Sequence, residues 1–368
     1  MSFTVNLSSS LECQIPSTNC LLVGEASPEE SILSSSHHIH IDSLFGSAIG
    51  ELVFEPLPFN HPLCILYSSG TTGKPKCIVH SVGGTLLQHL KEHLLHGDVD
   101  QHDVFLQFSS IGWMMWHWSI SVLAIPKVVL VLFDGSPLKP HPQDLWNRMA
   151  QLKVTHFGSS AKYFITLQEQ GVSIPALETL RVMFSTGSPL PSSTFEYLYN
   201  HVKGDMKTRV MLASITGGTD IISLFCGGNP VLKVHSGEIQ CKCLGMDVSP
   251  HPIKLTNDGG DSNGDSSELS GDLVCRTVFP SMPIYFWNDP QGKVYQRTYF
   301  ETIKGVWFHG DYLRINPHTG GIIMLGRSDG TLNPRGIRFG SADLYNVLAD
   351  KAVFLYLVFR SFPRSLIL

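Results

Sequence analysis

The sequence has few charged residues and no apolar run long enough to cross a membrane. Only 15% of its 368 residues are Asp, Glu, Lys or Arg, and the net charge is -5. We therefore expect no nucleic-acid partner, because such partners need a strongly basic surface. The longest apolar tracts, Val128–Phe133 and Ala352–Phe359, are far below the roughly 20 residues that span a bilayer. We expect no membrane insertion.

The chain also lacks a signal for secretion and a paired cysteine motif. Its first residues do not combine a charged start with an apolar run, which predicts no signal peptide. The eight cysteines form no CxxC pair, and several lie inside apolar runs. Buried, reduced thiols in the cytosol are the expected state. His37–His40 alternates with isoleucine, so we interpret it as an exposed strand or loop, and we expect no structural metal.

What is present indicates an α/β fold. Apolar runs of strand length alternate with helical patterns, and glycine turns follow several strands, which predicts a parallel sheet wrapped by helices. The expected strands are Val128–Phe133, Val154–Phe157, Leu180–Ser185 and Val210–Ile215, and the helices between or beside them are Gln143–Leu152 and Ser193–His201. From Leu273 the pattern becomes β-like, with Val306–Phe308 and Leu313–Ile315 among the short strands.

The clearest predicted helix is Gly84–His96. Five leucines within it recur at helical spacing and predict a buried apolar stripe. They are Leu86, Leu87, Leu90, Leu94 and Leu95.

A polar, glycine-containing loop, Tyr67–Lys76, lies between two apolar runs of strand length. Glycines allow close backbone approach to a ligand, and amides with hydroxyls can hold an oxyanion. Lys74 adds a positive charge that suits phosphate. The spacing is not that of a P-loop, because only two residues separate Gly70 from Gly73 and Pro75 follows the lysine. The sequence thus predicts a phosphate-binding loop of another kind, with a flexible hairpin loop as the alternative.

All ten residues of this loop resemble the phosphate-binding signature of the adenylate-forming superfamily, which includes acyl-CoA synthetases, luciferases and peptide-synthetase adenylation domains. The resemblance implies the large domain of that superfamily, with a small β-subdomain. It also implies that one set of loop residues binds ATP. That set is Ser68, Ser69, Gly70, Thr71, Thr72, Gly73 and Lys74.

Further segments resemble the superfamily's nucleotide-binding elements in the same order along the chain. Gly187, Ser188 and Pro189 resemble the turn beside adenine, although an ordinary strand–helix turn is the alternative. Thr219 and Asp220 resemble the element that contacts phosphate and Mg²⁺; the alternative is a helix N-cap.

Later segments resemble the ribose and hinge elements. Asp311 resembles the aspartate that holds the ribose hydroxyls, and Arg327 an arginine that reaches ribose and phosphate. The implied catalytic residues are Lys74, Thr219, Asp220 and Arg327. Asp329 matches the hinge position, and Gly336 and Arg338 match the loop used in thioester formation.

Longer stretches between about residues 50 and 348 resemble the branch of acyl-CoA synthetases that activates acetoacetate. The implied substrates are acetoacetate, ATP and CoA, with Mg²⁺. Trp113, Gly217 and Gly218 are the expected acyl-pocket residues, because the two glycines replace bulky side chains of acetate- and propionate-activating relatives. Another short-chain acyl-CoA synthetase and a non-catalytic nucleotide-binding fragment are the alternatives. The sequence leaves the oligomeric state open.

The expected domains are a remnant of the N-terminal subdomain (residues 1–50), an AMP-binding large domain (51–327, β-rich from about 273), and a hinge with a truncated C-terminal lobe (328–368). Superfamily members carry a longer segment before the loop and a late lysine used in adenylation. Neither has a counterpart here, and residues 349–368 resemble no part of the family. We therefore expect impaired adenylation and a tendency to aggregate.

Overall fold

The computed structural model describes residues 54–68, 75–175, 177–201, 210–251 and 269–328, together with two short strands nearer the amino terminus. The chain divides into two compact units, residues 1–56 and 57–368. In the first unit, strand β1 (Cys20–Leu22) pairs in parallel with β2 (His38–His40). All that follows concerns the second unit. Among the described residues, no helix is long and apolar enough to span a bilayer.

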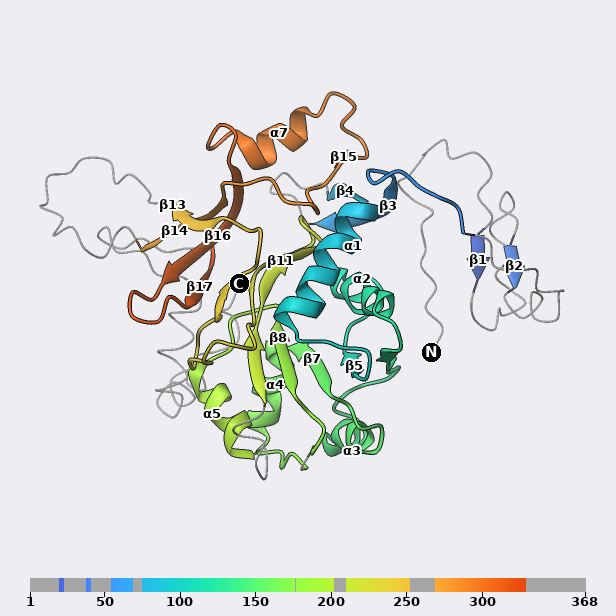
Figure 1. The fold of residues 1–368 in the computed structure, drawn as a ribbon, viewed down its shortest axis with the longest axis vertical. Coiled ribbons are helices and arrows are strands. Elements are labelled where there is room, and N and C mark those ends of the chain that lie inside the picture. Colours follow the sequence, from blue (N-terminus) through green and yellow to red (C-terminus); the bar gives the residue numbers. More distant parts are fainter. Residues whose placement is uncertain are drawn as a thin grey trace, which may run out of the picture. The chain divides into compact units, whose positions relative to one another are not determined.

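A five-stranded parallel sheet forms the centre of this unit (Figure 1). Its strand order is β6-β5-β7-β8-β9, and every pair is parallel. The strands are β5 (Val104–Gln107), β6 (Val129–Leu130), β7 (His156–Ser160), β8 (Val182–Thr186) and β9 (Met211–Ser214). The predicted parallel sheet is confirmed.

Helices cover the two faces of this sheet. Alternate strand residues Leu106, Phe157 and Met183 share one core with side chains of three helices. These helices are α3 (Gln143–Gln151), α4 (Ala161–Glu169) and α5 (Ser192–His201). On the other face, Phe105 and Phe184 pack with helix α2 (Met114–Ile120), which is followed by the 3₁₀ turn η3 (Ser121–Ala124). This alternation is what a sheet covered on both sides requires.

The predicted strand Val128–Phe133 is only partly correct. Just Val129 and Leu130 form β6, and the Val129 side chain is exposed. β6 lies at the edge of the sheet, paired with β5 alone. An edge strand can leave part of an apolar run facing solvent. The apolar run Val128–Phe133 therefore did not predict a fully buried strand.

The loop Tyr67–Lys76 joins an antiparallel hairpin, as the alternating apolar and polar runs predict. Strand β3 (Pro62–Ser68) pairs with β4 (Lys76–Ser81), and β15 (Tyr285–Phe286) adds to the far side of β4. Helix α1 (Val82–Lys91) begins immediately after β4, with the Ser81 hydroxyl accepting from the Gly84 amide as N-cap. It continues into a π-helical turn, η2 (Glu92–His96).

The predicted leucine stripe of this helix is wrong in its orientation. Leu86, Leu87, Leu94 and Leu95 are exposed, and the opposite, polar face is buried. That buried face consists of Thr85, Gln88, His89, Glu92, His93 and His96. It packs against backbone carbonyl and amide groups of residues 222–228, which need hydrogen-bonding partners. The polar backbone groups of residues 222–228 therefore determine which face of the helix is buried.

Antiparallel strands form the remainder of the unit. A four-stranded sheet has the order β13-β14-β16-β17, and a three-stranded sheet the order β10-β11-β12; helix α7 (Lys293–Phe300) packs beside β16. The strands are β10 (Thr216–Gly218), β11 (Ser223–Gly227), β12 (Cys241–Lys242), β13 (Val248–His251), β14 (Ser270–Cys275), β16 (Trp307–Ile315) and β17 (Ile322–Arg327). The two predicted strands Val306–Phe308 and Leu313–Ile315 are thus one continuous strand.

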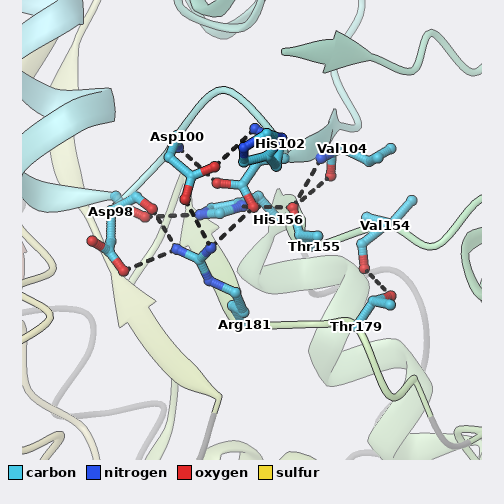
Figure 2. A network of polar contacts seen from close by, with 11 residues as sticks. Asp98, Asp100, His102, Val104, Val154, Thr155, His156, Thr179 and Arg181 are labelled. Atoms are coloured by element: carbon cyan, nitrogen blue, oxygen red, sulfur yellow. Dashed lines mark hydrogen bonds and ion pairs between the residues drawn. The ribbon is translucent and has the colours of Figure 1, made fainter. Parts of the chain in front are cut away.

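A charged cluster ties the amino ends of β5, β7 and β8 together (Figure 2). Arg181, just before β8, donates to Asp98 at 2.9 Å and to Asp103 at 3.2 Å, and lies 3.6 Å from Asp100. Asp103 is buried and lies 3.6 Å from the ring of His156, the first residue of β7. We refer to these five residues as the amino-end cluster.

Candidate functional site

A cavity of about 490 Å³ lies where the carboxyl ends of β8 and β9 meet the β10–β11 turn and strands β16 and β17. Parallel α/β sheets bind ligands beyond the carboxyl ends of their strands, so this is the expected position. Ten residues predicted from the sequence line it. They are Trp113, Gly187, Ser188, Pro189, Gly217, Gly218, Thr219, Asp220, Asp311 and Arg327.

Nine other predicted residues lie outside the part of the chain that the structure describes. They are Ser69, Gly70, Thr71, Thr72, Gly73, Lys74, Asp329, Gly336 and Arg338. Ser68, the last residue of β3, is described, and its hydroxyl lies 3.3 Å from Asp220. The start of the predicted phosphate loop is therefore directly beside the predicted metal ligand.

Asp220 lies in the turn between β10 and β11, so the alternative of a helix N-cap is wrong. Its Oδ1 accepts from the Lys76 ammonium and, at 2.5 Å, from the Tyr299 hydroxyl. Burial acts to raise the pKa of this carboxyl, but Lys76, His309 and the hydrogen bonds outweigh it, and the net shift is downward. Asp220 is therefore a half-buried carboxylate that stays ionised at neutral pH.

The turn that carries Thr219 and Asp220 has an uncommon backbone. Ile222 has φ of 50°, in the left-handed region that a β-branched residue rarely adopts. Two histidines donate to carbonyls on either side of the turn: His80 to Thr219 at 3.0 Å and His89 to Ile222. A strained backbone conformation persists only where surrounding contacts hold it in place. The hydrogen bonds from His80 and His89 are two such contacts.

Glu92 extends the same support along β11. Its carboxylate is fully buried and accepts from the Ser223 hydroxyl at 2.5 Å, the Leu224 amide at 3.1 Å and the Trp118 indole at 2.9 Å. Burial raises the pKa of Glu92, opposed by Lys91 and these donors. We call His89, Glu92, His93 and His96 the polar ladder. It supports the strand that forms one wall of the cavity.

The two pocket glycines differ in what they permit. A Cβ on Gly217 would lie 1.9 Å from the Ser223 carbonyl oxygen, so strand pairing itself requires glycine there. A Cβ on Gly218 would meet only the His309 ring, at 3.8 Å. Gly218 is therefore the position where the missing side chain leaves usable space in the cavity. Trp113 lines the same cavity and is 61% exposed, which suits a contact residue rather than a core residue.

Asp311 and Arg327 face each other across the paired strands β16 and β17. Arg327 Nη1 lies 3.2 Å from Asp311 Oδ1, and the ring of His309 lies 3.4 Å from Asp311 Oδ2. Burial lowers the pKa of His309, although Asp311 and Asp220 oppose that shift. The imidazole thus contacts one carboxylate of the cavity and is close enough to the other to be affected by its charge.

Comparison with known proteins places this chain in a family. The family model described as "AMP-binding enzyme" matches residues 9–213, more than half of the chain. The chain belongs to the AMP-binding enzyme family. Its fold is that of the large domain of adenylate-forming enzymes, as the sequence resemblance implied.

Several acetoacetyl-CoA synthetases are similar to this AMP-binding family member. That of Gallus gallus is 50% identical over 306 residues, which cover 82% of this chain and 44% of the relative. That of Rhizobium meliloti is 49% identical, covering 83% and 45%. The solved structure of acetoacetyl-CoA synthetase from Streptomyces lividans superposes with a TM-score of 0.76 at 37% identity, covering 90% of this chain and 49% of that one. The chain therefore spans about half the length of these relatives.

The residues around Asp220 fit the Mg²⁺ that the family implies. The chemistry of the donors is suitable: one ionised carboxylate with the hydroxyls of Ser68 and Thr219 nearby. Mg²⁺ prefers hard oxygen ligands and commonly takes one or two carboxylates plus substrate phosphates. Among the described residues, no group of three or more His, Cys, Asp or Glu could hold an ion by itself. The site suits a cation that arrives with phosphates.

Three residues that hold the site in place were missed by sequence reasoning. Lys76 had a signal, because it is the last residue of the loop that carries the resemblance, although only Lys74 was predicted to bind phosphate. Glu92 also had one, since a lone acid in a leucine-rich helix is costly unless partnered. Tyr299 had none, because nothing local connects it with Asp220, 79 residues earlier.

Proposed function

We propose that the chain is the AMP-binding part of an acid–thiol ligase that converts acetoacetate and CoA to acetoacetyl-CoA, with release of AMP and pyrophosphate. The observation that carries the proposal is the single cavity that collects the predicted adenine, metal, ribose and acyl residues. These residues come from segments as distant in sequence as Trp113 and Arg327. The similarity to acetoacetyl-CoA synthetases supports the choice of substrate.

In this proposal the acetoacetate carboxylate attacks the α-phosphorus of ATP, and pyrophosphate leaves. The thiolate of CoA then attacks the acyl carbon, and AMP leaves. Asp220 would hold Mg²⁺, which offsets charge on the phosphates. Asp311 has two acceptor oxygens that suit the vicinal ribose hydroxyls, and Arg327 would reach ribose and phosphate, with Ser188 and its neighbours beside adenine.

The remaining assignments rest on the sequence resemblance. Lys74 and the loop from Ser68 to Gly73 would hold the β- and γ-phosphates, with Lys74, Thr219, Asp220 and Arg327 as the catalytic residues. Asp329, Gly336 and Arg338 would serve the hinge and the CoA step. We propose the domain division given above and a cytosolic location.

The acyl half of the cavity would lie around Trp113 and Gly218. Because a side chain at Gly218 has room to project into the cavity, a bulkier residue there should exclude the acyl group first. We expect Gly218→Leu to abolish acetoacetate-dependent turnover while AMP binding stays within about twofold.

Acetoacetate-dependent ATP–pyrophosphate exchange tests the reaction, with acetate, propionate and butyrate as competing acids. Preference for acetoacetate supports the proposal, and preference for a simple fatty acid assigns another short-chain substrate. Calorimetric titration with ATP and a non-hydrolysable acyl-adenylate separates binding from catalysis. A chain that binds neither would contradict the proposal.

A further inference from the structure

Tyr299 is a buried residue that contacts the predicted metal ligand from a distant part of the chain. It lies on α7 and is 2% exposed. Its ring stacks on the Trp307 indole, with centroids 3.7 Å apart and planes at 15°. Its hydroxyl donates to Asp220 Oδ1 at 2.5 Å. A stacked ring fixes the direction of its hydroxyl, so this bond is geometrically well defined.

The hydrogen bonds divide the two oxygens of Asp220 into different roles. Oδ1 accepts from both Lys76 and Tyr299. Within the described part of the chain, the bond recorded for Oδ2 is the long contact of 3.3 Å from Ser68. Oδ2 therefore keeps most of the remaining capacity to accept a cation.

We propose that Tyr299 is a positioning residue that holds Oδ1 of Asp220, so that Oδ2 stays available to a divalent cation bound with nucleotide phosphates. This inference rests on the proposed function. It adds a residue that neither the family match nor the sequence motifs singled out.

Lys76 alone would not keep the carboxylate in this orientation. Its ammonium is a compact charge that can approach either oxygen, because a flexible stem carries it. The ammonium also lies 5.4 Å from the centroid of the Tyr299 ring, a cation–π distance. Without the hydroxyl, the carboxylate can rotate and present both oxygens to Lys76. The cation would then compete with Lys76 for Oδ2.

Tyr299 is suited to donate rather than to accept. A phenol carries one O–H donor and keeps its proton at neutral pH, whereas the ionised carboxylate of Asp220 can only accept. The same residue is anchored to β16, which carries the predicted ribose ligand. Trp307 begins β16, and its indole lies 3.5 Å from Nδ1 of His309, whose ring reaches Asp311. The stacked pair Tyr299 and Trp307 therefore links the positions of Asp220 and Asp311.

The test compares Tyr299→Phe with Tyr295→Phe in the full chain. Tyr299→Phe keeps the ring that stacks on Trp307 and removes only the hydroxyl. Tyr295 lies on the same helix, with its ring 5.3 Å from that of Tyr299, and is the matched control. Calorimetric titrations measure ATP with Mg²⁺, ATP with a chelator, and AMP. Thermal unfolding checks that each variant folds.

We expect Tyr299→Phe to reduce the gain in ATP affinity from Mg²⁺ about tenfold, the usual cost of losing a group that orients a metal ligand. AMP affinity should stay within about twofold, and Tyr295→Phe should behave as the unsubstituted chain. Equal weakening of ATP and AMP, or no change in Tyr299→Phe, would overturn the inference and leave the proposed function standing. No ATP binding by the unsubstituted chain would overturn both.

Discussion

Two polar clusters, one on helix α1 with its π-helical turn and one beginning in the chain that follows, hold their acidic groups in different ways. The polar ladder contains one acid, fully buried, whose oxygens accept from neutral donors. The amino-end cluster pairs one arginine with three aspartates, and Arg181, Asp98 and Asp100 are 37%, 59% and 56% exposed (Figure 2). The ladder lies under the cavity, and the amino-end cluster lies at the other end of the sheet.

The difference shows how each cluster contributes to stability. A buried carboxyl group is tolerated only while its hydrogen bonds are complete, so the loss of one ladder residue should destabilise the fold strongly. Exposed ion pairs are screened by solvent and salt, so the amino-end cluster should contribute less, mainly through the buried Asp103. Four experiments can break or sharpen this contrast.

The largest effect is expected for Glu92→Leu. The substitution leaves the Ser223 hydroxyl, the Leu224 amide and the Trp118 indole without their acceptor in a dry core. We expect a loss of about 4 kcal/mol in the free energy of unfolding, measured by urea denaturation. Glu92→Gln keeps one acceptor oxygen and should lose less. A loss below about 1 kcal/mol for Glu92→Leu would show that the ladder does not carry the stability assigned to it.

The second effect is acid destabilisation through the ladder histidines. Burial lowers the pKa of His89 to about 4 and that of His93 to about 3, against about 6.5 in an unfolded chain. The unfolded chain therefore binds protons first as the pH falls. Stability is complete above pH 6.5 and declines below it, by about 1 kcal/mol for each histidine between pH 7.5 and 5.5. Urea denaturation at three pH values measures the decline.

His93→Phe provides the control for this pH dependence. It removes one titrating group from the core and should reduce the decline by about 1 kcal/mol. If the decline is the same in the variant, then His93 does not contribute to the acid destabilisation.

A smaller effect is expected for Arg181→Met at the amino-end cluster. The change leaves the buried Asp103 without the Arg181 cation, while Asp98 and Asp100 stay hydrated because they are exposed. We expect a loss of about 1.5 kcal/mol, less than for a fully buried pair because Arg181 is partly exposed. AMP affinity should not change. The double variant with Asp103→Asn should recover part of the loss, and strict additivity of the two changes would contradict coupling.

The smallest effect is expected for the exposed leucines of helix α1 and its π-helical turn, on the face opposite the polar ladder. Leu87 and Leu94 are 52% and 44% exposed. Replacing each with Gln should change the free energy of unfolding by less than about 0.5 kcal/mol, in contrast to the inner face. Leu90→Gln, at a partly buried position, is the matched control and should cost more. A large loss for Leu94→Gln would mean that the outer leucines are covered in solution.

Much of the sheet could be predicted from sequence because its signals are local. Apolar runs ending in glycine marked β8 and β9, and Tyr67–Lys76 marked the β3–β4 hairpin. The orientation of α1 could not be predicted, since it depends on which backbone groups of residues 222–228 face it. Leucine spacing reports a hydrophobic face, but it does not report where the unpaired carbonyls of a partner lie.

The candidate site also contains residues that local motifs predict and residues that only contacts between distant segments reveal. Sequence motifs predicted Thr219, Asp220, Asp311 and Arg327, which the structure brings to one cavity. The groups that hold them in place come from contacts between distant segments, as with Tyr299, and no local pattern carries that information. The strained φ of Ile222 is likewise a property of the assembled turn, not of its residue type.

The β3–β4 hairpin makes Asp220 a shared anchor for both ends of the predicted phosphate loop. Ser68 ends β3, Lys76 begins β4, and both contact this one carboxylate. Any ligand that changes how Asp220 is engaged must therefore alter the free energy of the loop termini as well. By thermodynamic reciprocity, whatever stabilises one arrangement of those termini changes cation affinity at Asp220 by the same factor. Phosphate capture and cation binding would then be a single coupled equilibrium rather than two independent events.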